Sequence, residues 1–74
     1  MRRKYAVIFE QAKHNWAAYV PDLPGCIAAG ESREEVLQLI GEAVEFHLEG
    51  LKQEGLLIPQ PHSSSTFVEV HARQ

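Results

Sequence analysis

Residues 32–55, SREEVLQLIGEAVEFHLEGLKQEG, decide the fold class because they describe one long amphipathic helix with a start signal and a stop signal. Ser32 lies three residues before Glu35, which is the spacing of a capping box, and acids in the first turn suit the helix dipole. Gly55 can end the helix in a left-handed turn, and Pro59 beyond it forbids a resumption. We therefore predict a helix over residues 33–54.

The apolar residues of this helix form a stripe and a shoulder when they are placed at about 100° per residue. The stripe predicts the face that covers a sheet, and it consists of Val36, Leu37, Ile40, Val44, His47, Leu48 and Leu51. Leu39 and Phe46 lie on the shoulder and make the apolar arc wider than one sheet needs. Two interpretations stay open: residues 56–58 fold back over them, or they contact another subunit. The second makes Leu39 and Phe46 candidates for self-association.

Three segments before the helix favour strands because they are rich in β-branched and aromatic residues. Residues 4–10 predict a first strand whose apolar side chains on both faces are typical of a central strand covered on two sides. Residues 16–20 and 26–29 predict the second and third strands, and residues 66–70 a fourth after the helix. The expected fold class is α+β with the order βββαβ: an antiparallel three-stranded meander, one long helix and a fourth strand.

The segment between the second and third strands, residues 21–26 (PDLPGC), is the most specific short motif. Each proline lacks an N–H and restricts the residue before it, while Gly25 suits the positive-φ corner of a turn. One interpretation is a rigid turn, with Asp22 capping backbone N–H groups and Leu23 packed beneath. The other is a preformed edge that presents Asp22 and Leu23 to a partner at a small entropy cost.

Length and charge exclude several classes of protein. The 74 residues allow one small core, so a homo-oligomer (a dimer or tetramer) or a bound partner is expected to add stability. Seven basic against ten acidic residues give a net charge of -3, which disfavours direct binding of nucleic acid. The longest apolar run is about five residues, too short for a membrane span or a signal peptide. We expect a cytoplasmic protein with a reduced Cys26.

The side chains that could act in catalysis or metal binding do not form a catalytic site. The histidines lack the spacing of a helical or turn-borne metal pair, and Cys26 has no base that spacing can assign to it. Carboxylates on the helix fall on its solvated face rather than converging in a pocket. We predict no catalytic residue, no metal and no cofactor, and thus a protein that is not an enzyme. The histidines are His14, His47, His62 and His71.

Taken in order, these features resemble the HicB-like antitoxin domain of type II toxin–antitoxin systems. Residues 21–26 resemble the P-D-L-P-G-C turn of that family in full. Residues 30–36, GESREEV, are similar to its G-(D/E)-(T/S)-x-E-E-A helix entry, with valine for the usual alanine, and residues 59–61 resemble its P-x-P exit. The resemblance covers residues 4–61 and indicates a single HicB-like domain over residues 1–74.

The resemblance implies a partial ribonuclease H-like fold without catalytic acids, and a small basic HicA toxin, an mRNA interferase, as the partner. It implies an antitoxin that neutralises this enzyme by masking its surface, for which a negative net charge is suited. Family members that bind their operator carry a further C-terminal DNA-binding segment, so we expect no operator binding from this sequence. We place the partner contact at Tyr19, Pro21, Asp22, Leu23 and Pro24.

Two other functions stay open. The chain could be an orphan oligomerising or small-ligand-binding module without a toxin, or it could retain a nuclease or RNA-binding activity, against which its charge argues. A short basic companion gene favours the antitoxin over the orphan module. If Leu23 contacts the toxin, a Leu23→Asp substitution is expected to weaken capture and leave the fold intact.

Overall fold

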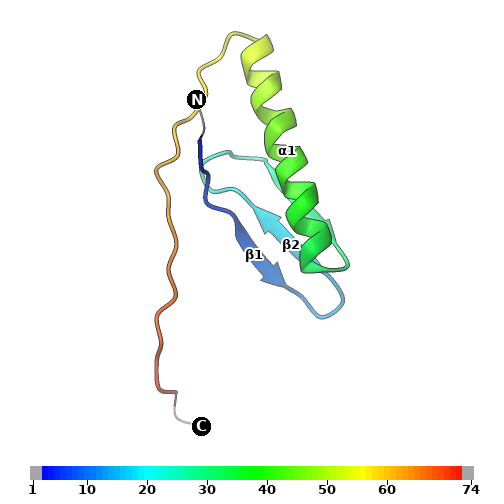
Figure 1. Cartoon of the computed structure of the whole chain (residues 1–74), viewed down its shortest axis with the longest axis vertical. Helices are drawn as coiled ribbons and strands as arrows, with labels where there is room; N and C mark the ends of the chain where they lie inside the picture. Colours follow the sequence, from blue (N-terminus) through cyan, green and yellow to red (C-terminus); the bar gives the residue numbers. More distant parts are fainter. Residues whose placement is uncertain (1–2, 73–74) are drawn as a thin grey trace.

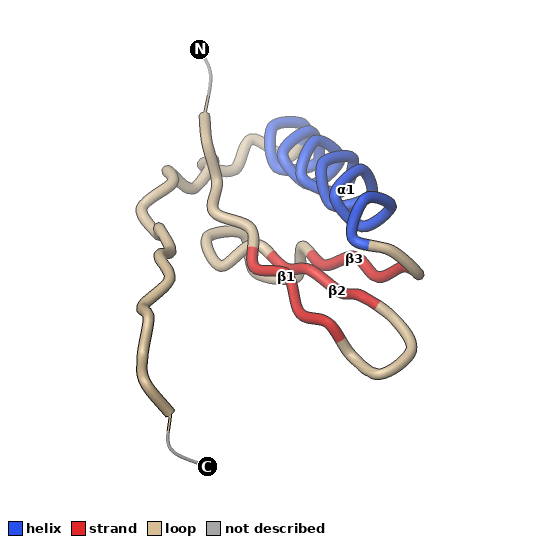
Figure 2. The backbone as a smooth tube through the Cα atoms, turned by 60° about the horizontal axis from the view of Figure 1, so that its bottom comes forward, coloured by secondary structure: helices blue, strands red, loops and turns tan. Residues whose placement is uncertain are grey.

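The computed structural model describes residues 3–72 and shows three strands followed by one helix. The elements are β1 (Ile8–Gln11), β2 (Trp16–Tyr19), β3 (Ile27–Gly30) and α1 (Arg33–Gln53). The strands form one antiparallel sheet in the order β1-β2-β3, and α1 packs across one face of it (Figures 1 and 2). The predicted α+β class, with its meander and long helix, is confirmed.

The strand register sorts the side chains onto two different faces of the sheet. Ala18 lies opposite Phe9 on one side and Ala28 on the other, and this row faces α1, where Ala18 is buried. The prediction of a central first strand covered on both faces is wrong. β1 is an edge strand, and α1 covers only one face of the sheet (Figure 2). Apolar side chains on both faces of β1 reflect a core on one side and an exposed apolar row on the other.

The core is small and lies between the sheet, the 21–26 turn and α1. Its buried side chains are Ala18, Val20, Leu23, Cys26, Val36 and Ile40. Val44 and Leu48 of the predicted helix stripe pack against this cluster. Leu37, by contrast, is 53% exposed. It lies about 100° around the helix from Val36, and a sheet of three four-residue strands is too narrow to cover that side of α1.

Local signals set both ends of α1. The side chain of Ser32 accepts a hydrogen bond from the backbone N–H of Glu35 at 3.1 Å, and Glu35 in turn accepts one from the N–H of Glu31 at 2.7 Å. Gly55 has a φ of +71°, and the N–H of Leu56 donates to the carbonyl of Leu51 at 2.9 Å. The Ser32 cap and the terminating glycine are therefore confirmed, while the glutamate of the expected capping box binds the N–H of Glu31, one residue before the cap.

The fourth strand expected at residues 66–70 does not form. After Gly55, the described residues form neither helix nor strand, and the chain runs back past the sheet as an extended segment (Figure 1). Phe67, Val68 and Val70 are 102%, 76% and 73% exposed. Alternating apolar residues favour an extended backbone, but a strand also needs a neighbour with which to pair, and this segment has none within the described part of its own chain.

Candidate functional site

The 21–26 turn is built around a buried leucine. The N–H of Leu23 donates to the carbonyl of Val20, and the N–H of Cys26 donates to the carbonyl of Leu23, both at 3.0 Å. Gly25 takes a φ of +86°, which explains the glycine after the second proline. Leu23 is completely buried, so the expectation that its side chain is presented to a partner is wrong. Pro21 and Pro24, in contrast, are exposed.

Asp22 ties this turn to the segment that follows the helix. Its Oδ2 accepts hydrogen bonds from the backbone N–H groups of His62 and Ser63, both at 2.9 Å. Its Oδ1 accepts one from the Ser63 hydroxyl at 2.7 Å and lies 3.2 Å from Nε2 of His62. We call these three residues the Asp22 clasp.

The clasp explains both the burial and the acidity of Asp22. The residue is 5% exposed, and the hydroxyl and backbone N–H of Ser63, with the donors of His62, lower its pKa from 3.8 to about 2. Asp22 therefore does cap backbone N–H groups, but those groups lie forty residues further along the chain. The expectation that its side chain is displayed to a partner is wrong, because its oxygens are already occupied.

Aspartate, histidine and serine occur together here without forming a nucleophilic triad. Both His62 Nε2 and Ser63 Oγ contact Oδ1 of Asp22, so the carboxylate lies between the imidazole and the hydroxyl. A catalytic histidine has to bind the hydroxyl whose proton it removes. Cys26 is buried, and burial raises the pKa of its thiol, which disfavours the nucleophilic thiolate. Within residues 3–72, no three His, Cys, Asp or Glu side chains are grouped to hold a metal ion.

The uncovered side of the sheet carries an apolar row, of which only Tyr19 was predicted from the sequence as a contact residue. Ile8 of β1 lies opposite Tyr19 of β2, which lies opposite Ile27 of β3. Tyr19 is 39% and Ile27 70% exposed, and Ile8 is half-buried. We call this row the open sheet face. Glu10 lies two residues from Ile8 on the same side of β1 and adds a carboxylate beside it.

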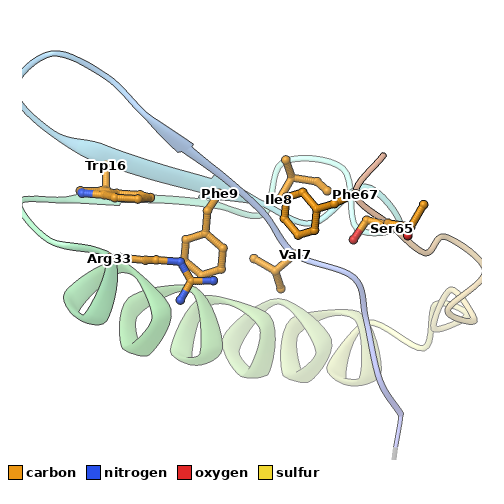
Figure 3. A pocket seen from close by; sticks show the side chains of 8 residues that line it. Val7, Ile8, Phe9, Trp16, Arg33, Ser65 and Phe67 are labelled. Atoms are coloured by element: carbon orange, nitrogen blue, oxygen red, sulfur yellow. The ribbon is translucent and has the colours of Figure 1, made fainter. Parts of the chain in front are cut away.

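A hollow of about 570 Å³ lies between β1 and the segment that contains Phe67 (Figure 3). Val7 and Phe9 point toward the helix side, where the Arg33 guanidinium lies 4.2 Å from the centre of the Phe9 ring. Ile8 points the other way, toward Phe67 (Figure 3). The lining residues are Val7, Ile8, Phe9, Trp16, Arg33, Ser65, Thr66 and Phe67. This mainly apolar lining suits side chains of a peptide segment.

The shoulder of α1 stays uncovered in the single chain. Phe46 is 83% and Leu39 36% exposed, while Leu56 and Leu57 after the helix are themselves 54% and 93% exposed. The interpretation that residues 56–58 fold back over the shoulder is therefore wrong. Contact of Leu39 and Phe46 with another subunit stays a prediction. Within residues 3–72, α1 is also not apolar enough to cross a membrane.

Sequence and fold comparisons both lead to one family. Residues 5–72 match the family described as HicB_like antitoxin of bacterial toxin-antitoxin system. The chain is 34% identical to antitoxin HicB 2 of Photorhabdus laumondii in an alignment 74 positions long, which covers 93% of this chain and 50% of that protein. It is also 34% identical to a UPF0150 protein of Thermoplasma acidophilum, with 93% and 99% of the two chains covered.

A protein of Haemophilus phage HP1 is 28% identical over 86% of this chain and 48% of its own length, so the chain spans about half of two of these relatives. Among solved structures, a chain of the HicA3 and HicB3 toxin-antitoxin complex superposes with a TM-score of 0.68 at 28% identity, over 81% of this chain and 70% of that one. The matched region includes the sheet, the 21–26 turn and α1, and the chain accordingly belongs to the HicB-like antitoxin family of bacterial toxin–antitoxin systems.

Proposed function

We propose that this protein neutralises a small basic toxin of the HicA type by binding it and masking its RNA-binding surface, without catalysis. The observation that carries the proposal is the open sheet face, a row of half-buried Ile8, partly exposed Tyr19 and exposed Ile27 on a domain of net charge -3. The structural neighbour comes from a toxin–antitoxin complex, which supports a toxin as the occupant.

Tyr19 is the residue that we expect to anchor this contact. It lies in the middle of the row, its ring is partly exposed, and tyrosine is enriched at the centre of protein interfaces. Pro21 and Pro24 are exposed at the end of β2, where they extend the same contact. Asp22 and Leu23 support it indirectly, because they hold the turn that carries the prolines.

Electrostatic attraction is expected to guide the toxin to this surface. Glu10 lies beside the apolar row, and the chain carries three more acidic than basic residues. A carboxylate beside the apolar row and a negative net charge favour the approach of a basic nuclease and compete with the phosphates of its RNA substrate. The measured association rate is therefore expected to fall as the salt concentration rises.

Substitution at the centre of the open sheet face tests the proposal. We expect Tyr19→Ala to weaken binding to a purified basic toxin of the HicA type by about tenfold or more in isothermal titration. Leu57→Ala is the control, because it shortens an apolar side chain that is more exposed than Tyr19 and follows α1, outside the sheet. Circular dichroism checks that both variants stay folded. Equal affinities for Tyr19→Ala and Leu57→Ala would remove the open sheet face from the toxin interface.

A ribonuclease assay separates masking from a retained catalytic activity. We propose that the purified protein neither cleaves RNA nor shifts it in a gel, and that it protects RNA from the toxin at an equimolar ratio. The non-enzymatic function would be contradicted if the purified protein cleaved RNA without toxin and this activity co-eluted with it through purification.

A second function, self-association, is favoured by the exposed helix shoulder. We propose that Leu39 and Phe46 contact another subunit, since an 83% exposed phenylalanine on a regular helix is typical of an interface. Sedimentation equilibrium of Phe46→Ser is expected to show weaker self-association than the unsubstituted chain. An orphan module without a toxin would keep this self-association and bind no neighbouring gene product.

A further inference from the structure

The segment after the Asp22 clasp gives the molecule an open shape. We call residues 64–72 the C-terminal arm. The radius of gyration is 14.6 Å and the longest extent is 52 Å, whereas a compact chain of this length has a radius of gyration of about 11 Å. Figures 1 and 2 show why: the arm runs past the sheet and continues beyond the body of the domain.

The arm is chemically suited to burial rather than to solvent. Its residues Phe67, Val68 and Val70 are all largely exposed, and Glu69 carries its only formal negative charge. A basic toxin is expected to favour a more acidic surface than this arm, which carries a single carboxylate. The arm therefore fits a neutral, apolar receiving site.

Such a site lies along β1. Because β1 is an edge strand, the outward N–H and C=O groups of Ile8–Gln11 are free to pair with an added strand. The 570 Å³ hollow beside β1 is lined mainly by apolar side chains, Val7 and Trp16 among them. Ser65, Thr66 and Phe67 of the same chain reach its rim, yet Phe67 stays 102% exposed and does not fill it.

The start of the arm is fixed by contacts that precede the hollow beside β1. The Asp22 clasp holds His62 and Ser63 against the 21–26 turn, and the Tyr5 hydroxyl donates to the carbonyl of Pro59 at 2.5 Å. Pro59 and Pro61 stiffen the connection between these anchors. The chain continues past the sheet after the hollow, and within residues 3–72 the predicted strand at residues 66–70 pairs with no other strand.

We propose that the C-terminal arm of one copy adds as a strand to β1 of a second copy, with Phe67 seated in the hollow, and that two copies exchange arms reciprocally. Each copy then donates one arm and receives one, so the assembly closes as a two-fold dimer with no free β1 edge. The exchange places the fourth strand of the fold in the partner copy, where it finds the neighbour that it lacks within its own chain.

Mixed single-cysteine variants test the exchange. Ile8→Cys and Phe67→Cys are made separately in full-length protein carrying Cys26→Ala, mixed in equal amounts and oxidised mildly. We expect a disulfide between position 8 of one copy and position 67 of the other, identified by mass spectrometry of the linked peptide. Leu57→Cys mixed with Ile8→Cys is the control for random collision, since Leu57 is also highly exposed but precedes the arm.

Two results would overturn the proposal. The first is an Ile8→Cys and Phe67→Cys pair that links at no higher yield than the Leu57→Cys control, and the second is a chain with both cysteines that oxidises only within itself.

A second measurement does not use disulfides and does not need the toxin. We expect Phe67→Ser to weaken self-association at least tenfold in sedimentation equilibrium while the circular dichroism spectrum stays unchanged. Leu57→Ser is the matched control, because it removes a similarly exposed apolar side chain that precedes the arm. If Phe67→Ser lowers the association constant no more than Leu57→Ser does, the arm exchange is wrong.

Discussion

The hydroxyl of Ser63 donates a hydrogen bond of 2.7 Å to Oδ1 of Asp22, which joins two residues that are 41 positions apart. Asp22 belongs to the turn between β2 and β3, and Ser63 comes after the end of α1. The bond therefore closes the chain around the small core. It also determines where the C-terminal arm leaves the domain, since the arm begins at the next residue.

Removing the charge of Asp22 should release the start of the arm. Asp22→Asn keeps the size of the side chain but replaces one acceptor oxygen with an NH₂ group, which cannot accept from the N–H groups and hydroxyl that now meet there. We expect a lower melting temperature and faster amide hydrogen exchange at residues 62 and 63. Glu69→Gln is the control, because it removes a carboxylate from the exposed arm. Unchanged exchange at residues 62 and 63 would show that the clasp does not hold this segment.

The clasp should also make the stability of the fold depend on pH in the acidic range. The pKa of Asp22 is lowered from 3.8 to about 2, so the folded state favours the charged form. Its contribution is fully present above the unfolded-state pKa and is lost as the pH falls through the folded-state value. The difference in melting temperature between the unsubstituted protein and Asp22→Asn should stay constant above about pH 5 and shrink toward pH 2. A difference independent of pH would contradict the assignment, since all other carboxylates are common to both proteins.

Leu23 is expected to act through the fold rather than through direct contact with the toxin. It is completely buried, and a Leu→Ala substitution in a core costs about 2–5 kcal/mol, comparable to the roughly 3–5 kcal/mol that a core of this size supplies. Leu23→Ala should therefore be largely unfolded in urea titrations, and Leu23→Asp more so. A folded Leu23→Asp variant with weakened toxin binding would restore the original expectation.

Features governed by neighbouring residues were predictable, and those governed by distant partners were not. Ser32 and Gly55 act within one helical turn, so both ends of α1 followed from the sequence. The Asp22 clasp left no comparable signal, because an aspartate in a turn has many local donors and nothing in the sequence marks Ser63 as its partner. The fourth strand failed for a related reason: the pattern around Phe67 predicts an extended backbone but not the strand beside it.

Gly30 and Glu35 offer a test of how the helix start is coupled to the sheet. A Cβ at position 30 would lie 2.6 Å from Oε1 of Glu35, the oxygen that accepts from the N–H of Glu31. Gly30→Ala should push this flexible side chain aside and break that bond, so it should destabilise the protein by about 1 kcal/mol, as loss of a capping interaction does.

Because Gly30→Ala and Glu35→Ala should remove the same hydrogen bond, their effects should not add. The double variant is expected to lose little more stability in urea denaturation than either single variant, a coupling of at least 0.5 kcal/mol on the scale of about 0.5–3 found for residues in contact. Ser32→Ala combined with Gly30→Ala is the matched control, since the Ser32 hydroxyl serves a different N–H, that of Glu35. Additive losses for Gly30→Ala and Glu35→Ala would mean that the alanine fits without displacing the carboxylate, and that the helix start tolerates a side chain at the end of β3.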